Sequence, residues 1–179
     1  MSLIDQTYFQ GTIAIPASKY EPIQGVIDRY ESQLIMDLFG YELAKLVKAY
    51  DPLTSEQRII DIVQGKEFTT RGGDLQKWNG LINDEKESVI AYYVFYKWAI
   101  ERETIATRSA AIKPTPENSE NVSFETKAFA AYNHMLNLYG YRGQCDYAPS
   151  CFNFMYANQD LYPEWKFQEK RPINLLGIW

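Results

Sequence analysis

The sequence predicts a mainly α-helical protein: a compact bundle of about five helices with extended N- and C-terminal arms, a glycine-rich turn region and a long loop. Two observations predict this fold class. Apolar residues recur three and four positions apart along most of the 179 residues. One run, VIAYYVFYKWAI at 89–100, is apolar on every side, as expected for a helix that is packed all round. We expect one domain over 1–179, with an arm at 1–17, a loop at 107–122 and a tail at 162–179.

The N-terminal arm alternates loosely between apolar and polar residues, and Gly11 interrupts the alternation. This pattern predicts an arm or an edge strand that becomes ordered against a partner. Tyr8 and Phe9 are therefore candidate contact residues.

The first helices follow the arm. Helical spacing over 21–38 predicts a long helix that ends at Phe39-Gly40, because glycine accepts the left-handed conformation that closes helices. A second helix follows at once and stops before Asp51-Pro52.

A short third helix comes next, capped by Thr54 or Ser55 and ended by Gly65. The irregular stretch 66–83 contains two glycine turns, which predict a hairpin or a protruding loop. One of these turns, Arg71-Gly72-Gly73-Asp74, lacks the Lys-Ser/Thr ending of a phosphate loop.

The second half begins with the aromatic helix, expected from Asn83 to Glu103, with Asp84 and Glu87 at the spacing of a capping box. The polar loop at 107–122 is either a binding loop or a plain surface connection. Its candidate contact residues are Ile112, Pro114 and Pro116.

Ser123 is expected to cap a last long helix that ends by Gly140 or Gly143. A further helical segment is expected within 149–161. The apolar tail is expected to pack against a protein surface. Its candidate contact residues are Leu176, Ile178 and Trp179.

Aromatic residues are abundant: 14 Tyr, 9 Phe and 4 Trp. So many tyrosine hydroxyls are hard to satisfy inside one small domain, and we therefore favour contact surface over a purely internal role. The aromatic helix must be surrounded by its own chain or by neighbouring copies. We expect that the chain hides too little apolar surface by itself.

The net charge and the lack of targeting signals restrict the classes of function that we expect. The formal net charge is −5, and no basic stripe is present to wrap nucleic acid. The aromatic run is too short and too tyrosine-rich to span a bilayer. The N-terminus lacks the pattern of a signal peptide, so a reducing cytoplasm is expected.

Residues that could carry chemistry are few, and we expect no catalytic, cofactor or metal site. Cys145 and Cys151 are expected to be reduced, partly buried thiols. The single histidine, His134, has no partner at metal-site spacing, so a surface or core-edge role is favoured. Trp78 and Trp98 are expected in the core.

Three stretches together resemble a known family. IDRYESQLIMDLFGYELAKLV (27–47) is similar to a helix–LG-turn–helix signature, although Leu38-Phe39-Gly40 stands where Leu-Leu-Gly is commoner. The stretch 78–123 resembles the family's Trp-Gly-Leu turn, IAYYVYY helix and following loop, and YPEWKFQEKRPINLLGIW (162–179) resembles its C-terminal ending. The family is the head–tail connector (neck or head-completion) proteins of tailed phages and prophages in Bacteroidetes hosts, including crAss-like phages.

The resemblance implies a structural virion protein, made in the host cytoplasm, that forms a ring in the neck between portal and tail. The ring is twelvefold if it follows portal symmetry. Its implied partners are copies of itself, the portal protein and other neck or tail proteins, while DNA passes its channel without sequence-specific binding. The resemblance implies no catalytic residue, no cofactor and no membrane contact.

Two alternatives stay open. One is a soluble helical adaptor or regulatory binding module outside the virion. The other is a hydrolase that uses His134 or the acidic cluster at Asp84.

Overall fold

The computed structural model describes residues 2–16, 22–108, 124–141 and 149–173. The protein is mainly α-helical, and the prediction of fold class is confirmed. The elements of the described residues follow in chain order: η1 (Gln6–Tyr8), η2 (Gly11–Ile13), α1 (Ile23–Lys48), α2 (Gln57–Gln64), β1 (Lys66–Thr69), β2 (Leu75–Trp78), α3 (Val89–Arg108), α4 (Phe124–Tyr139), α5 (Cys151–Ala157) and η3 (Gln159–Leu161).

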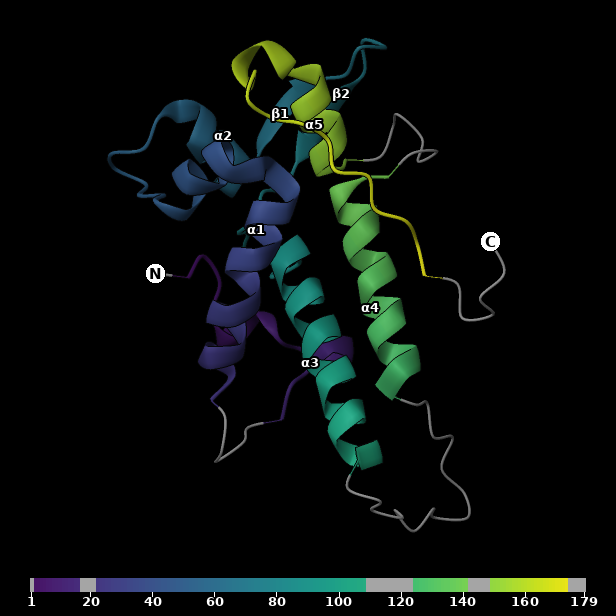
Figure 1. Ribbon diagram of the computed structural model, residues 1–179. Coiled ribbons are helices and arrows are strands. Elements are labelled where there is room, and N and C mark those ends of the chain that lie inside the picture. The colour runs from purple at the N-terminus through teal and green to yellow at the C-terminus, as the bar shows by residue number, and fades with distance from the viewer. Residues whose placement is uncertain (1, 17–21, 109–123, 142–148, 174–179) are drawn as a thin grey trace.

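The long helices α1, α3 and α4 lie side by side, with α3 between the other two (Figure 1). The two-stranded sheet, α2 and α5 gather at one end of this bundle (Figure 1). No helix in the described ranges is both long and apolar enough to cross a membrane.

The aromatic helix α3 is surrounded by its own chain. Its side chains that face α1, α4 and the N-terminal segment are buried: Val89, Ile90, Ala91, Tyr93, Val94, Phe95, Trp98 and Ala99. Intramolecular packing therefore accounts for the run of apolar residues on every side. The expectation that Trp78 and Trp98 lie in the core is confirmed.

The predicted break at Gly40 is confirmed. Gly40 has φ 73° and ψ 171°, so the helical path of α1 is interrupted there and a kink separates its two parts. A residue with a Cβ rarely adopts this conformation, which explains why glycine marks the change of direction.

The start of α3 differs from the predicted capping box. Ser88 caps the helix, because its hydroxyl accepts a hydrogen bond from the Ile90 N–H at 3.2 Å. The Asn83 side chain instead closes the preceding turn by pairing with both the N–H and the carbonyl of Glu87. The helix continues to Arg108, so the first two residues of the expected loop are helical.

The short helix α2 ends at Gly65 as predicted, but neither Thr54 nor Ser55 caps it. Its N-cap is Glu56, which makes no side-chain cap, and the Ser55 hydroxyl accepts from the Asp51 N–H instead. The cap was misassigned because the helix begins one residue later than expected: Glu56, and not Ser55, directly precedes Gln57.

The hairpin prediction is confirmed. Strands β1 and β2 pair antiparallel, with Lys66 opposite Trp78 and Thr69 opposite Leu75. The turn closes through hydrogen bonds between Thr70 and Asp74, and Gly73 has φ 94°.

Helix α4 ends at Gly140, which has φ 101°, so the nearer of the two expected endings is the one observed. The helical segment expected within 149–161 is present as α5 and η3. The expected cap Ser123 lies outside the described residues.

Candidate functional site

The N-terminal segment packs on its own chain. The side chains of Tyr8 and Phe9 are 5% and 7% exposed and lie in the main core. The expectation that they form a free contact surface is therefore corrected. Two short 3-10 turns fold the segment back on the bundle, so its apolar residues find intramolecular partners instead of forming an edge strand.

Buried polar contacts fix this segment. The Glu31 carboxylate of α1 accepts hydrogen bonds from the N–H of Leu3 at 2.9 and 3.1 Å and from that of Ile4 at 3.3 Å. The Tyr8 hydroxyl both accepts from the Asn83 N–H, at 3.1 Å, and donates to the Asn83 carbonyl, at 3.2 Å. The segment is thus tied to α1 and to the turn before α3.

Burial of Glu31 predicts how the stability of the fold depends on pH. Burial is the largest influence on this carboxyl and raises its pKa, with Asp28 acting in the same direction and the hydrogen bonds from Leu3 and Ile4 opposing it. The folded state then binds a proton before the unfolded state does. The contribution of Glu31 to the free energy of unfolding is therefore least favourable at neutral pH. It improves as the pH falls towards the ordinary pKa of a glutamate side chain.

We expect the wild-type protein to gain stability relative to a Glu31→Gln variant when the pH is lowered from 7 to 5. Urea unfolding of both proteins at the two pH values measures this difference. Asp5, whose pKa is lowered by hydrogen bonds from Thr7, remains in both proteins and cancels from the comparison. If the stability of the wild type relative to Glu31→Gln stays constant or falls on acidification, the raised pKa of Glu31 is contradicted.

The C-terminal segment is also docked on its own chain. From Tyr162 it runs back along α4 (Figure 1), and the Trp165 indole N–H donates to the Leu38 carbonyl at 3.2 Å. Farther along, the Asn133 side chain pairs with both backbone groups of Ile173, at 2.8 and 2.9 Å. The tail is therefore held to α4 up to Ile173.

The remaining predicted contact residues lie outside the described part of the chain. Those of the loop are Ile112, Pro114 and Pro116, and those of the tail are Leu176, Ile178 and Trp179.

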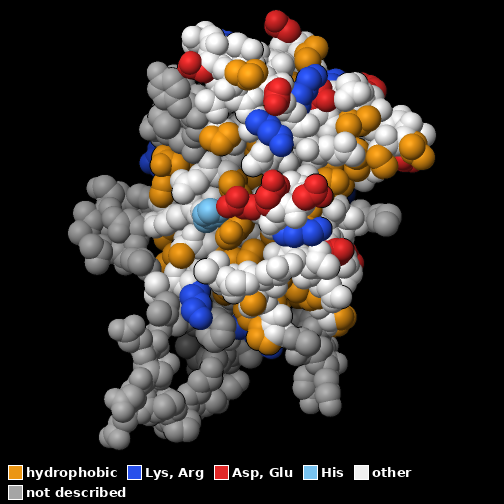
Figure 2. Space-filling model, turned by 180° about the vertical axis from the view of Figure 1, so that it is seen from behind, with side chains coloured by type: hydrophobic (Ala, Val, Ile, Leu, Met, Phe, Trp, Pro, Cys, Tyr) orange, Lys and Arg blue, Asp and Glu red, His pale blue; other side chains and the backbone are white. Residues whose placement is uncertain are grey.

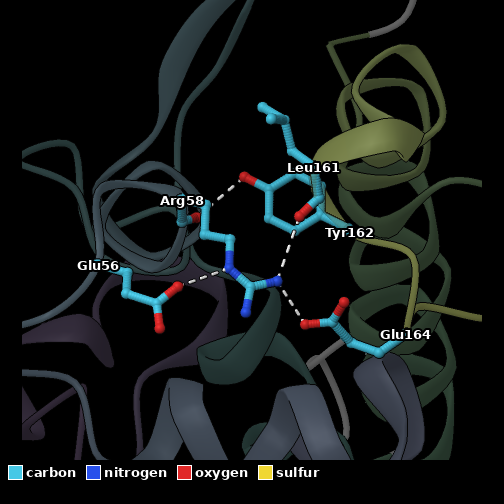
Figure 3. A network of polar contacts seen from close by, with 5 residues as sticks. All are labelled: Glu56, Arg58, Leu161, Tyr162 and Glu164. Carbon is cyan, nitrogen blue, oxygen red and sulfur yellow. Dashed lines mark hydrogen bonds and ion pairs between the residues drawn. The ribbon is translucent and has the colours of Figure 1, made fainter.

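Arg58 is the centre of a polar network that joins α2 to the C-terminal segment (Figure 3). Its guanidinium contacts the carboxylates of Glu56 and Glu164 and donates to the Leu161 carbonyl at 3.2 Å. The Tyr162 hydroxyl donates to the Arg58 carbonyl at 2.9 Å. Hydrogen bonds to the two carboxylates raise the pKa of Arg58. The contacts of Arg58 with Leu161 and Glu164 join segments that are distant in sequence.

His134 is half-exposed and pairs with Glu87, whose Oε1 lies 2.7 Å from the histidine Nε2. Acidic side chains gather beside the histidine on the face shown in Figure 2. The ring also packs against Tyr92, with centroids 4.2 Å apart. This is the position at the edge of the core that the sequence favours.

The acidic cluster and His134 face different hollows. Asp84 and Glu85 line a polar hollow of about 700 Å³ together with Lys77 and Lys86. His134 instead lines a groove between η2, α3 and α4. Within the described ranges, no group of three His, Cys, Asp or Glu side chains could hold a metal ion.

This groove, which we call the α3–α4 groove, has a volume of about 510 Å³. Its walls are mixed. The apolar side chains are Ile13 of η2, Tyr92 of α3, and Ala130 and Ala131 of α4, and the polar ones are Thr12, Thr126, Lys127 and His134. It is open to the surface.

Cys151 is fully buried, and burial raises the pKa of its thiol well above its ordinary value. It is more deeply buried than expected. Cys145 lies outside the described residues.

The aromatic helix is covered by its own chain, while the expectation that the chain as a whole hides too little apolar surface stays a prediction. In the described residues, the large apolar side chains with substantial exposure are Met36, Tyr41, Leu53, Leu75, Tyr156 and Leu161. Several tyrosine hydroxyls also find partners within the chain, including those of Tyr8, Tyr139 and Tyr162.

Comparison with known proteins gives no match: no family model, curated protein or solved structure is similar to this chain at a significant level.

Sequence reasoning missed Glu31 and Asn133, which hold the two terminal segments. Both are polar residues on long helices and look like ordinary surface positions. One signal was present: Glu31 follows Ile27 and Tyr30 and precedes Leu34 on the apolar face of α1, where an unpaired carboxylate would be costly.

Proposed function

We propose that this chain is a structural protein of a tailed-phage virion, a ring-forming subunit of the neck between portal and tail. The observation that carries the proposal is the resemblance of stretches 27–47, 78–123 and 162–179 to head–tail connector proteins. In the fold, these stretches contribute most of α1, all of α3 and the C-terminal segment that is docked through Trp165, whereas α4, the third long helix of the bundle, lies outside them.

The use of polar side chains supports a structural role. Glu31 ties the N-terminal segment to α1, and Arg58 ties α2 to the C-terminal segment. Asn133 fixes Ile173 on α4. Each of these side chains makes hydrogen bonds within the chain that hold two segments together. This is expected for a subunit that keeps a defined shape while its neighbours assemble around it.

The proposed partners are copies of the chain, the portal protein and other neck or tail proteins. Subunits in a ring make heterologous contacts, in which one surface of a subunit meets a different surface of the next. The segments proposed to make these contacts are the loop at 107–122 and the tail end at 174–179. A formal charge of −5 suits a channel past which DNA moves without being held.

Deletion of residues 174–179 tests this role. We expect the truncated chain to keep its helical fold, because the deletion begins just after the anchor at Ile173, and to be lost from assembled particles. Circular dichroism measures the fold, and quantification of the chain in purified particles measures incorporation. Leu53→Ser, at a side chain that is 91% exposed, is the control for a change of an apolar surface residue outside the tail.

Normal incorporation of a truncated chain that has the wild-type helix content contradicts the proposed role of the tail. Absence of the wild-type chain from particles contradicts the proposed function itself.

A further inference from the structure

We propose that the α3–α4 groove is the docking site for residues 174–179 of the same chain in the isolated subunit. This inference concerns the free protein and does not depend on the virion role. It rests on the position of the last anchor, the distance that six residues can cover, and the chemistry of the groove.

The last anchor places the start of this segment beside the groove. Asn133 holds both backbone groups of Ile173 on α4. Ala130 and His134, which line the groove, are three residues before and one residue after Asn133 on the same helix. Ile173, the last described residue, is therefore held less than one helical turn of α4 from residues that line the groove.

The length of the segment matches the groove. Six extended residues span at most roughly 20 Å. The α4 wall of the groove runs from Thr126 to His134, which corresponds to about 12 Å of helix. The segment can thus pass over the small side chain of Ala130 and still follow the groove along the α4 wall.

The chemistry also matches. The segment Asn-Leu-Leu-Gly-Ile-Trp carries four large apolar side chains and no charged side chain. The groove offers the Tyr92 ring and the methyl groups of Ala130 and Ala131, and its volume of about 510 Å³ can take more than one such side chain. The loop at 107–122 also adjoins α4 in sequence, but it is mostly polar and matches these walls poorly.

An intramolecular site also has a concentration advantage. A segment tethered next to its groove experiences an effective concentration in the range of mM, far above the concentration of other copies in dilute solution. Docking would therefore shield the apolar side chains at 175–179 in the free subunit.

Trp179 provides a direct probe. The other tryptophans, Trp78, Trp98 and Trp165, are at most 7% exposed, so the difference between the wild type and Trp179→Phe isolates the emission of Trp179. We expect this emission to be blue-shifted and several-fold less sensitive to acrylamide than that of a free tryptophan. The protection should not change with protein concentration.

Ala130→Glu places a carboxylate in the groove at an exposed position of α4, where glutamate is compatible with helix. We expect this variant to lose the protection of Trp179 while keeping its helix content. Ala49→Glu, at an exposed alanine outside the groove, is the matched control and should keep the protection.

Three results would overturn the proposal. Full exposure of Trp179 in the wild type means that the groove does not hold the segment. Protection that appears only at high concentration assigns the groove to the tail of a second copy. Protection that survives Ala130→Glu in a folded variant places the segment elsewhere.

Discussion

Gly80→Ala is expected to destabilise the fold by more than about 3 kcal/mol. Gly80 has φ +85°, and a Cβ at this position would lie 2.5 Å from the Gln64 carbonyl carbon and 2.6 Å from the Val63 oxygen. Both are backbone atoms at the end of α2, which side-chain rotation cannot move. The end of α2 and the segment after β2 approach closely here, and this approach also constrains Gly65, where a Cβ would lie 2.2 Å from the Trp78 oxygen.

Gly25→Ala is the matched control. Gly25 lies in the first turn of α1, and no atom outside the adjacent helix backbone lies within 4 Å of an added Cβ, so the same substitution should stabilise the helix by up to about 1 kcal/mol. Urea unfolding of the two variants and the wild type measures both effects. A Gly80→Ala variant as stable as the wild type would show that α2 and the hairpin do not cross as closely as described.

Trp78→Ala is expected to cost about 3–5 kcal/mol, a large part of the stability of a typical domain. Trp78 is 2% exposed and packs at the end of β2. Its indole N–H donates to the Ile62 carbonyl at 2.9 Å, in the last turn of α2, where carbonyls lack partners within the helix. The substitution removes both a large buried side chain and this hydrogen bond.

Trp78→Phe separates the two contributions. Phenylalanine keeps most of the buried ring but cannot donate to Ile62, so its cost should fall clearly below that of alanine. Thermal and urea unfolding give the two costs. Equal costs for both variants would mean that packing at this position contributes little, against the burial observed.

The local elements could be predicted from the sequence because their signals are local. Gly40, Gly65 and Gly140 mark the ends of helical paths, and each has the positive φ that glycine adopts easily. The hairpin followed from its two glycine turns. The capping box failed because Asp84 and Glu87 have the required spacing, whereas Ser88 is the residue that meets the first free N–H groups of α3.

The candidate site could not be predicted in the same way because it depends on tertiary contacts. Tyr8 and Phe9 lie in an arm whose loose alternation is typical of an edge strand, and only the folded chain shows that both belong to the main core. The α3–α4 groove is built from η2, α3 and α4, which no local pattern brings together. Likewise, the apolar run of α3 left open whether its own chain or neighbouring copies would cover it.

The buried face of the aromatic helix is not available for contacts between subunits, because its own chain covers it in the described residues. The proposed contacts between subunits would therefore involve the surface, the loop at 107–122 and the tail end at 174–179. The claim of a ring in the neck accordingly depends on the family resemblance and on these segments, and not on an uncovered core.

The most direct test of this claim is the position of the chain in the virion. Image averaging of purified particles that carry a labelled copy of the chain gives this position. The account predicts the label at the portal vertex, as a ring between the head and the tail. A chain that stays monomeric in infected cells and is absent from mature particles would contradict it.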